Sequence, residues 1–229
     1  MHIAILEDDP DQSALLCLWL EEDGHRCSVF SSGKEIAKAV VRDSYDALIL
    51  DWLVPDMDGL EVLGWVRENL EWKIPILFIT QRDAEEDVVQ ALQSGADDYM
   101  AKPVKRGEML ARIHSIIRRA SPVIDESSDV LEFPPYALSK TARTVKLRDE
   151  IIEVTQKEYE LTLFMFKNAG RVLSRGYILE AVWGRSADVN TRTVDTHVSR
   201  LRRKLSIAVE NGWRLSSIYQ HGYRLEKIE

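Results

Sequence analysis

Acidic residues gather directly after the first apolar run of the chain. The stretch IAILEDDPDQ begins with a short run typical of a buried strand and continues into three consecutive acids, Glu7, Asp8 and Asp9. A further acid, Asp51, closes the apolar run DALILD. Carboxylates that a fold brings together repel one another unless a cation lies among them. A hard divalent cation such as Mg²⁺ takes oxygen ligands of this kind, typically one or two carboxylates together with a phosphate.

Two further apolar runs end in groups that phosphate chemistry needs. Thr80 ends IPILFIT with a hydroxyl, and Lys102 follows DDYMA with an ammonium group. A hydroxyl, an ammonium group and a metal ion together can bind three phosphoryl oxygens, and catalysis of phosphoryl transfer is mostly positioning and charge stabilisation. Asp51 is the remaining group that could act as nucleophile. We therefore predict phosphoryl transfer to Asp51, with Mg²⁺ as cofactor.

The elements that carry these residues alternate along the first 119 positions. The apolar runs HIAIL, RCSVF, DALIL, IPILFIT and DDYMA predict five strands, and periodic apolar residues predict helices over 12–22, 33–41, 59–69, 85–94 and 106–119. Such alternation is typical of βαβ units and a parallel sheet. Ligands of an open parallel sheet bind beyond the carboxyl ends of the strands, where the strand order reverses. A flavodoxin-like order would make the first and third strands neighbours and bring Asp51 beside Glu7 and Asp8.

The charge of the chain changes sign between its halves. Residues 1–119 hold 13 Lys and Arg against 23 Asp and Glu, whereas residues 130–229 hold 17 against 12. Between them, ASPVIDESSD at 120–129 has Pro, Ser and acids without periodicity, which indicates a linker. The acidic half suits a cation or a basic protein surface, and the basic half suits phosphate backbones. We therefore predict two domains, 1–119 and 130–229, joined by the linker 120–129.

A basic helix is the main feature of the second half. Short runs such as YALS, TVKL and IIEV predict a small antiparallel sheet, helices follow near 156–168, 175–183 and 191–205, and WRLSSIY with GYRLEKI predicts a closing hairpin. In the third helix an apolar stripe at spacings of four, three and four faces a core: Val194, Val198, Leu201 and Leu205. Basic and hydroxyl side chains share the other side, which fits the major groove of DNA: Arg192, Thr196, Ser199, Arg200 and Arg203.

Four motifs of the first half, ILEDD, LILDWLVPDMDGLEVL, ITQRD and GADDYMAKP, resemble the receiver domain of two-component response regulators. The resemblance implies a phosphoryl group accepted from a sensor histidine kinase on Asp51, with phosphate contacts from Thr80 and Lys102 and a rotating aromatic switch at Tyr99. It also implies direct Mg²⁺ ligation by Asp8, Asp51 and the backbone carbonyl of Leu53, with Glu7 acting through water.

In the second half, VTQKEYELTLFMFKNAGRVLSR, AVWG and NTRTVDTHVSRLRRKL resemble the winged-helix DNA-binding domain of the OmpR/PhoB group. The implied fold is α/β, a flavodoxin-like five-stranded parallel-sheet receiver followed by an α+β winged-helix domain. We expect base contacts from Thr196 and Arg200 and phosphate contacts from four further residues: Arg192, His197, Arg202 and Arg203. RNA polymerase is a further expected partner, through the loop WGRSADVN.

The family further implies a symmetric receiver dimer, formed on phosphorylation, that places two DNA-binding domains on repeated promoter half-sites. Residues matching its ion-pair positions are Asp97, Asp98, Glu108, Arg112 and Arg118. Four positions depart from the family pattern, and one of them is Val104, which replaces the common Phe after Lys-Pro. Gln81 replaces a small residue after the threonine, Val88 replaces a lysine that commonly pairs with the acid at 108, and Tyr219 replaces an arginine of the wing.

Two other classes of function fit parts of the sequence. A Mg²⁺-dependent phosphohydrolase with an aspartyl-phosphate would need a second acid two residues after Asp51, where Leu53 stands. The second alternative is a DNA-binding protein whose receiver works without phosphorylation. The intact set of Asp51, Thr80 and Lys102 argues against it. We favour a non-enzymatic transcription factor. We expect it in the cytoplasm, because no apolar stretch approaches the roughly 18 residues of a membrane span. Cys17 and Cys27 are interpreted as reduced packing residues.

Overall fold

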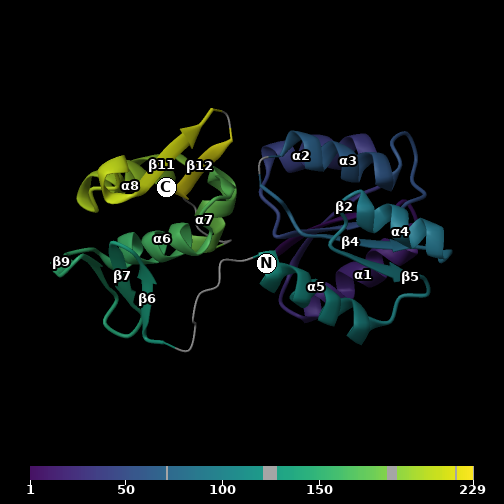
Figure 1. The fold of residues 1–229 in the computed structure, drawn as a ribbon, viewed down its shortest axis with the longest axis horizontal. Helices are drawn as coiled ribbons and strands as arrows, with labels where there is room; N and C mark the ends of the chain where they lie inside the picture. The colour runs from purple at the N-terminus through teal and green to yellow at the C-terminus, as the bar shows by residue number, and fades with distance from the viewer. Residues whose placement is uncertain (71, 121–127, 185–189, 220, 229) are drawn as a thin grey trace. The chain divides into compact units, whose positions relative to one another are not determined.

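Two compact units, Met1–Ala120 and Ser121–Glu229, make up the chain, and we call them the amino-terminal and carboxyl-terminal units (Figure 1). The computed structural model describes residues 1–70, 72–120, 128–184, 190–219 and 221–228. Most of the expected linker, residues 121–127, lies outside the described residues. No helix within those described ranges is both long enough and apolar enough to cross a membrane.

A five-stranded parallel sheet forms the centre of the amino-terminal unit. Its strands are β1 (His2–Leu6), β2 (Arg26–Phe30), β3 (Ala47–Leu50), β4 (Ile76–Thr80) and β5 (Asp98–Ala101). Their order is β2-β1-β3-β4-β5, which confirms the flavodoxin-like topology expected from the sequence. Every residue of β1, β3 and β4 is buried, because helices cover both faces of these strands.

Helices lie on both faces of this sheet, with α2 and α3 on one side and α1 and α5 on the other (Figure 1). The helices are α1 (Pro10–Glu22), α2 (Gly33–Arg42), α3 (Gly59–Asn69), α4 (Glu85–Gln93) and α5 (Arg106–Ala120). Successive side chains of a strand point to opposite faces of the sheet, so they pack into two separate hydrophobic cores. Along β1, Ala4 and Leu6 pack toward α2 and α3, whereas Ile3 and Ile5 pack toward α1 and α5.

The loops at the carboxyl edge of the sheet are fixed by helix caps. The Asp9 carboxylate caps α1 by accepting the backbone N–H groups of Asp11 and Gln12. Asp58 begins α3 with a reciprocal capping box to Glu61. The next residue is Gly59, where a Cβ atom would lie 2.1 Å from the backbone oxygen of Asp51. Glycine at this helix start therefore lets the loop pass close to the expected phosphoacceptor.

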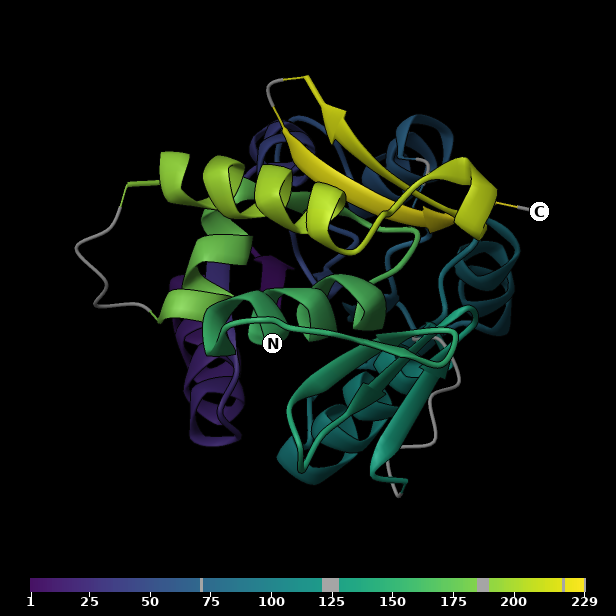
Figure 2. The same cartoon turned by 90° about the vertical axis from the view of Figure 1, so that its left-hand side faces the viewer.

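The described residues of the carboxyl-terminal unit form two antiparallel sheets, three α-helices and a short 3-10 helix. One sheet is β6 (Val130–Phe133), β7 (Tyr136–Ser139), β8 (Thr144–Leu147) and β9 (Glu150–Ile152). The helices α6 (Gln156–Lys167), α7 (Arg175–Trp183) and α8 (Arg192–Lys204) follow, and η1 (Val209–Asn211) is a short 3-10 helix. The second sheet has the order β10-β12-β11, from β10 (Val172–Ser174), β11 (Trp213–Ile218) and β12 (Gly222–Lys227). Figure 2 shows α6 between the first sheet and the closing hairpin, which confirms a winged-helix arrangement.

Two strands of this unit were not predicted. Val130–Phe133 alternates between exposed and buried side chains and pairs with β7. Val172–Ser174 is only three residues long and pairs with β12, about fifty positions further along the chain. Such a short segment has too few residues to show a period, so its strand character depends on the distant partner.

Candidate functional site

Three carboxylates meet at the carboxyl edge of the parallel sheet. Glu7 and Asp8 follow β1 and Asp51 follows β3, and these strands pair in parallel with Leu6 opposite Leu50. One carboxylate oxygen from each acid lies within 4.8 Å of the other two. Glu7 and Asp51 are buried and Asp8 is exposed. The structure therefore brings together the acids that the sequence analysis selected.

The Lys102 ammonium group lies between two of these acids. Its Nζ atom donates hydrogen bonds to Glu7 Oε2 at 2.7 Å and to Asp51 Oδ2 at 2.6 Å. Burial lowers the pKa of Lys102, but the hydrogen bonds to Asp51 and Glu7 outweigh that effect and leave its pKa raised. Burial raises the pKa of Glu7, and the hydrogen bond from Lys102 offsets this only in part. One cation therefore faces two buried carboxylates and leaves one negative charge uncompensated, and the exposed Asp8 adds another.

A cavity of about 520 Å³ opens beside this cluster. Its lining is mostly polar: Glu7, Asp8, Asp9, Pro10, Asp11, Gln12, Asp51, Leu53, Gln81 and Lys102. Gln81, which departs from the family pattern, thus lies where it can affect access of water to Asp51. Asp9 is occupied by its helix cap, and the hydrogen bonds from Gln12 lower its pKa. The third acid of the opening motif is accordingly a capping residue.

Thr80 and Tyr99 lie behind the cluster. The Thr80 side chain is fully buried, and its Oγ1 atom accepts a long hydrogen bond of 3.4 Å from the Arg82 N–H group. Tyr99 is 8% exposed, and its hydroxyl donates to the backbone carbonyl of Arg82. Its ring lies parallel to that of Phe78 with 6.3 Å between centroids. Burial raises the pKa of Tyr99 to about 12. The expected aromatic switch is therefore turned inward in this structure.

The residues expected at a receiver dimer interface form ion pairs within the chain. The Arg112 guanidinium donates to Asp98 at 2.9 Å and to Glu108 at 2.8 Å. Asp97 accepts a hydrogen bond of 2.9 Å from Arg67. Arg118 is exposed near the end of α5. These charges line α5 and the start of β5, and all but Arg118 have partners in their own unit.

Helix α8 presents the stripe expected to face DNA. Its buried side is Val194, Val198 and Leu201, as predicted. Arg192, Thr196, Ser199, Arg200 and Arg203 are exposed, which leaves a basic surface with two hydroxyl groups. His197 and Arg202 are only half-buried at the edges of the stripe. The His197 ring contacts Trp183, with 5.1 Å between centroids, and its Nδ1 atom lies 2.9 Å from the Thr193 carbonyl.

Three polar contacts that the sequence analysis missed anchor α8. Asp195 accepts hydrogen bonds from the Arg175 side chain at 2.8 Å and the Tyr223 hydroxyl at 2.5 Å, which joins α8 to α7 and β12. Lys204 donates to Glu158 of α6 at 2.7 Å. The sequence signal for these contacts is Asp195, a single acid inside an otherwise basic helix. These bonds tie the helix that carries the basic stripe to α6, α7 and β12.

The wing and the preceding loop are described in part. Tyr219 follows β11 and is 84% exposed, so an aromatic ring replaces the family's arginine at the tip of the hairpin. Of the loop WGRSADVN, expected to contact RNA polymerase, residues 185–189 lie outside the described residues.

Comparison with known proteins assigns both units. The family model for the response regulator receiver domain matches residues 3–114, and that for the C-terminal domain of transcriptional regulatory proteins matches residues 149–225. The sensory transduction protein RegX3 of Mycobacterium tuberculosis is 33% identical over 225 residues, which cover 98% of each chain. The transcriptional regulatory protein SrrA of Staphylococcus aureus is 32% identical, over 98% of this chain and 95% of its own.

Among solved structures, a response regulator from Chloroflexus aurantiacus aligns with a TM-score of 0.50 and 31% identity, over 52% of this chain and 98% of its own. The similarity covers both units and nearly the full length of the two sequence relatives. The chain therefore belongs to the two-component response regulators of the OmpR/PhoB group, which join a receiver domain to a DNA-binding transcriptional regulatory domain.

Proposed function

We propose that Asp51 accepts a phosphoryl group from a sensor histidine kinase in a reaction that depends on Mg²⁺. The observation that carries this proposal is the convergence of Glu7, Asp8 and Asp51 within 4.8 Å, with Lys102 beside them. The donor atoms are all oxygens, which suits Mg²⁺ better than softer metals. Asp8, Asp51 and the backbone carbonyl of Leu53 would hold the ion directly, and Glu7 would act through a water. Bound Mg²⁺ supplies positive charge to the phosphoryl oxygens.

The residues around Asp51 suit an in-line transfer. An Asp51 carboxylate oxygen attacks the phosphorus of a phosphohistidine, the O–P bond forms as the P–N bond breaks, and the imidazole leaves with the electron pair and takes up a proton. Lys102 Nζ lies 2.6 Å from Asp51 Oδ2, so it can move its hydrogen bond to a phosphoryl oxygen. The Leu53 N–H group donates to Asp51 Oδ1 at 3.3 Å and is a second donor directed at the reacting group.

Phosphorylation of Asp51 then changes the ion pairs that the side chains of α5 form. Thr80 is the last residue of β4, and β4 pairs with both β3 and β5. Movement of the Thr80 hydroxyl toward the phosphoryl group would therefore change the packing around Tyr99 on the neighbouring strand β5. The ion pairs that Arg112 forms with Asp98 and Glu108 break, and these side chains pair instead with a second copy of the receiver. Asp97 and Arg118 also form ion pairs with the second copy. Exposed pairs of this kind contribute only about 0–1 kcal/mol each, so their exchange costs little.

Dimerisation brings two carboxyl-terminal units to repeated half-sites about one helical turn apart. In each, α8 enters the major groove with Thr196 and Arg200 at base edges and Arg192 and Arg203 at phosphates. His197 and Arg202 add phosphate contacts from the edges of the stripe. The proposal includes RNA polymerase as a partner and the cytoplasm as the location.

The Lys102 contacts predict a test of the electrostatic balance. In Mg²⁺-free buffer at pH 7, Lys102→Met should lower the free energy of unfolding by about 3 kcal/mol, because it leaves two buried carboxylates without a cation. The Lys102 ammonium group lowers the pKa of Glu7, so its removal raises that pKa further above 4.5. Protonation of Glu7 in the variant then removes one uncompensated charge, and the loss should shrink as the pH falls toward about 4.5. Urea unfolding at several pH values measures this. Lys105→Met, at an exposed position, is the control, and equal losses in both variants would contradict the prediction.

Phosphorylation of Asp51 is tested with acetyl phosphate and intact-mass spectrometry. We expect the wild-type chain to gain one phosphoryl group in the presence of Mg²⁺ and none in EDTA, because the carboxylates repel the donor without the ion. Asp51→Asn should abolish the gain. Asp9→Asn should retain it, because asparagine also caps a helix. No modification of the wild-type chain would instead support a receiver that works without phosphorylation, and steady turnover of a phosphomonoester would support a phosphohydrolase.

Dimerisation through α5 is tested with beryllofluoride as a phosphoryl mimic. Light scattering should show a doubled mass, and the affinity for DNA with two half-sites should rise by about 100-fold. Arg118→Glu should remove both effects by reversing one interface charge. Arg119→Glu alters an adjacent exposed arginine outside the proposed set and should leave both intact. A mass that stays monomeric with beryllofluoride would exclude this mechanism.

The roles of individual arginines on α8 can be separated on a DNA duplex selected from a random pool. Arg200→Ala should weaken binding by about 1–3 kcal/mol and relax base preference at one position of the half-site. Arg203→Ala should weaken binding to all sequences and reduce the salt dependence by about one counterion. Lys146→Ala, exposed on β8 of the other sheet, is the control. Unchanged base preference in Arg200→Ala would refute its place at a base edge.

A further inference from the structure

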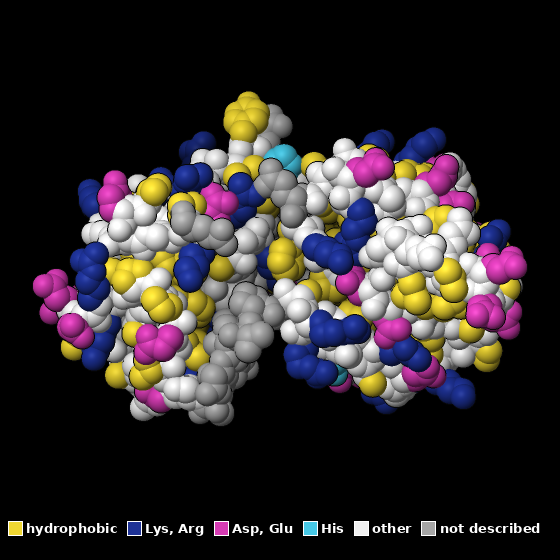
Figure 3. Space-filling view, in the orientation of Figure 1, with side chains coloured by type: hydrophobic (Ala, Val, Ile, Leu, Met, Phe, Trp, Pro, Cys, Tyr) yellow, Lys and Arg dark blue, Asp and Glu magenta, His cyan; other side chains and the backbone are white. Residues whose placement is uncertain are grey.

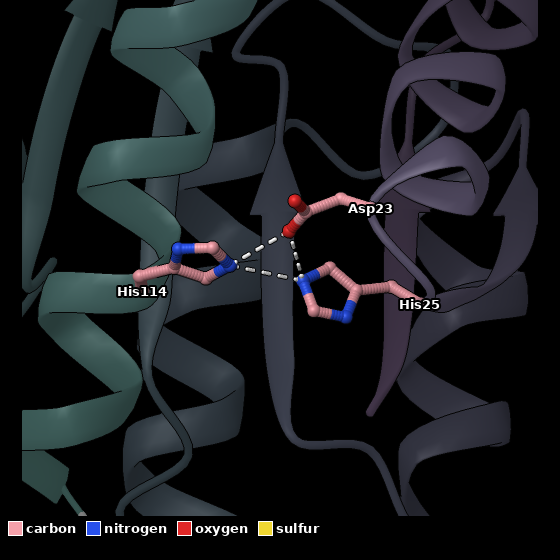
Figure 4. Close-up of side chains that lie close together, drawn as sticks. All are labelled: Asp23, His25 and His114. Atoms are coloured by element: carbon pink, nitrogen blue, oxygen red, sulfur yellow. Dashed lines mark hydrogen bonds and ion pairs between the residues drawn. The ribbon is translucent and has the colours of Figure 1, made fainter.

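A second cluster of potential metal ligands lies in the amino-terminal unit, away from Asp51. It consists of Asp23, His25 and His114 (Figure 4). Asp23 is the residue that caps the carboxyl end of α1, His25 directly precedes β2, and His114 lies on α5. His25 lies at the amino end of its strand, whereas Asp51 follows the carboxyl end of β3. In a parallel sheet these two ends lie at opposite edges. The cluster is therefore separate from the phosphorylation site.

The three side chains direct one donor atom each toward a common point (Figure 4). The two histidine Nε2 atoms are 3.3 Å apart. Asp23 Oδ2 lies 3.0 Å from His25 Nε2 and 2.8 Å from His114 Nε2. Ligand atoms that share a tetrahedral Zn²⁺ at 2.0–2.1 Å are separated by about 3.3 Å. The observed triangle is thus close to the size that such an ion requires, with a small opening at the carboxylate.

We propose that Asp23, His25 and His114 form a Zn²⁺ site. Two imidazole nitrogens and one carboxylate oxygen are a donor set typical of zinc, whereas Mg²⁺ and Ca²⁺ prefer oxygen ligands alone. Three protein ligands leave a fourth position for water. The His114 side chain is 44% exposed and that of Asp23 is 30% exposed, so an ion can reach the site from solvent.

Hydrogen bonding alone satisfies this triangle poorly. If both rings donate their Nε2 protons to Asp23 Oδ2, the two Nε2 atoms remain 3.3 Å apart with no hydrogen bond between them. A cation at the centre would accept the lone pairs of all three donors at once and balance the charge of Asp23.

The backbone holds the ligands in place before any ion binds. Gly24 has a φ of +79°, a conformation that suits glycine, and turns the chain between the two ligands Asp23 and His25. The His25 N–H group donates to the Leu20 carbonyl at 2.9 Å, which fixes the turn to α1. His114 follows Ile113, a fully buried residue of α5. The site would therefore need little rearrangement, and an occupied site would link α1 and β2 to α5.

Zinc binding is tested by isothermal titration of untagged, EDTA-treated full-length protein with ZnCl₂. Excess MgCl₂ is present throughout to occupy the carboxylates at Asp51. We expect one saturable Zn²⁺ per chain and an affinity more than about tenfold lower in His114→Gln and in Asp23→Asn, because loss of a ligand should cost at least as much as loss of a second-shell partner. Both positions are partly exposed, so these variants are expected to fold. His221→Gln, in the other unit, is the matched control and should bind as wild type.

Two further measurements are independent of affinity. Co²⁺ bound in place of Zn²⁺ should give the visible absorption of a four-coordinate ion, and this should be absent in His114→Gln. ZnCl₂ at about 100 times its dissociation constant should raise the unfolding midpoint of the amino-terminal unit on the order of 10 °C in wild type, with the rise largely lost in the two ligand variants. The proposal is overturned by the absence of saturable binding in MgCl₂, or by His114→Gln binding Zn²⁺ like wild type.

Discussion

Repulsion between carboxylates at one edge of a parallel sheet is the constraint on which the amino-terminal unit depends. Pairing of β1 with β3 makes the approach of Glu7 and Asp51 unavoidable, since both follow the last residue of their strands. The Lys102 ammonium group, 8% exposed in its side chain, contacts both buried charges but compensates only one of them. A group that enters this site must therefore bring positive charge or exchange places with Lys102. A divalent cation meets that requirement, whereas an anionic phosphoryl group does so only together with such a cation.

The sequence predicted the parts of the fold that show a clear period. Strands such as His2–Leu6 and helices such as Gly59–Asn69 were found with the bounds that the structure has. The same holds for the acid cluster, because the topology of a parallel sheet places strand ends together. The short strand Val172–Ser174 was missed, since its three residues depend on a pairing with β12. Contacts such as Asp195 with Tyr223 join positions 28 apart and leave no local pattern.

The histidine cluster shows a second kind of limit. His25 and His114 are separated by 89 positions, and neither lies in a motif with the spacing of metal ligands. Their approach follows from the packing of α1 and α5 on the same face of the sheet, where Leu16, Leu20, Ile113 and Ile116 share one core. Sequence reasoning can place α1 and α5 on that face, but the register of one helix against the other depends on side-chain packing. The three donor atoms therefore became apparent only in three dimensions.

Helix α5 connects these features because its faces serve different contacts. Met109, Ile113 and Ile116 recur at spacings of four and three and pack under the sheet. Glu108 and Arg112 lie one turn apart on one flank, where they form the proposed dimer surface, and the helical spacing puts His114 on the other flank. A bound metal ion would therefore leave Glu108 and Arg112 free while holding the same helix against α1 and β2, whereas Arg118 lies one turn after His114 on the metal-binding side. Both flanks belong to one continuous helix, so restraint by a bound ion on one flank would limit the positions that the other can adopt. Any coupling between the two sites would act through the orientation of α5 rather than through competition for the same side chains.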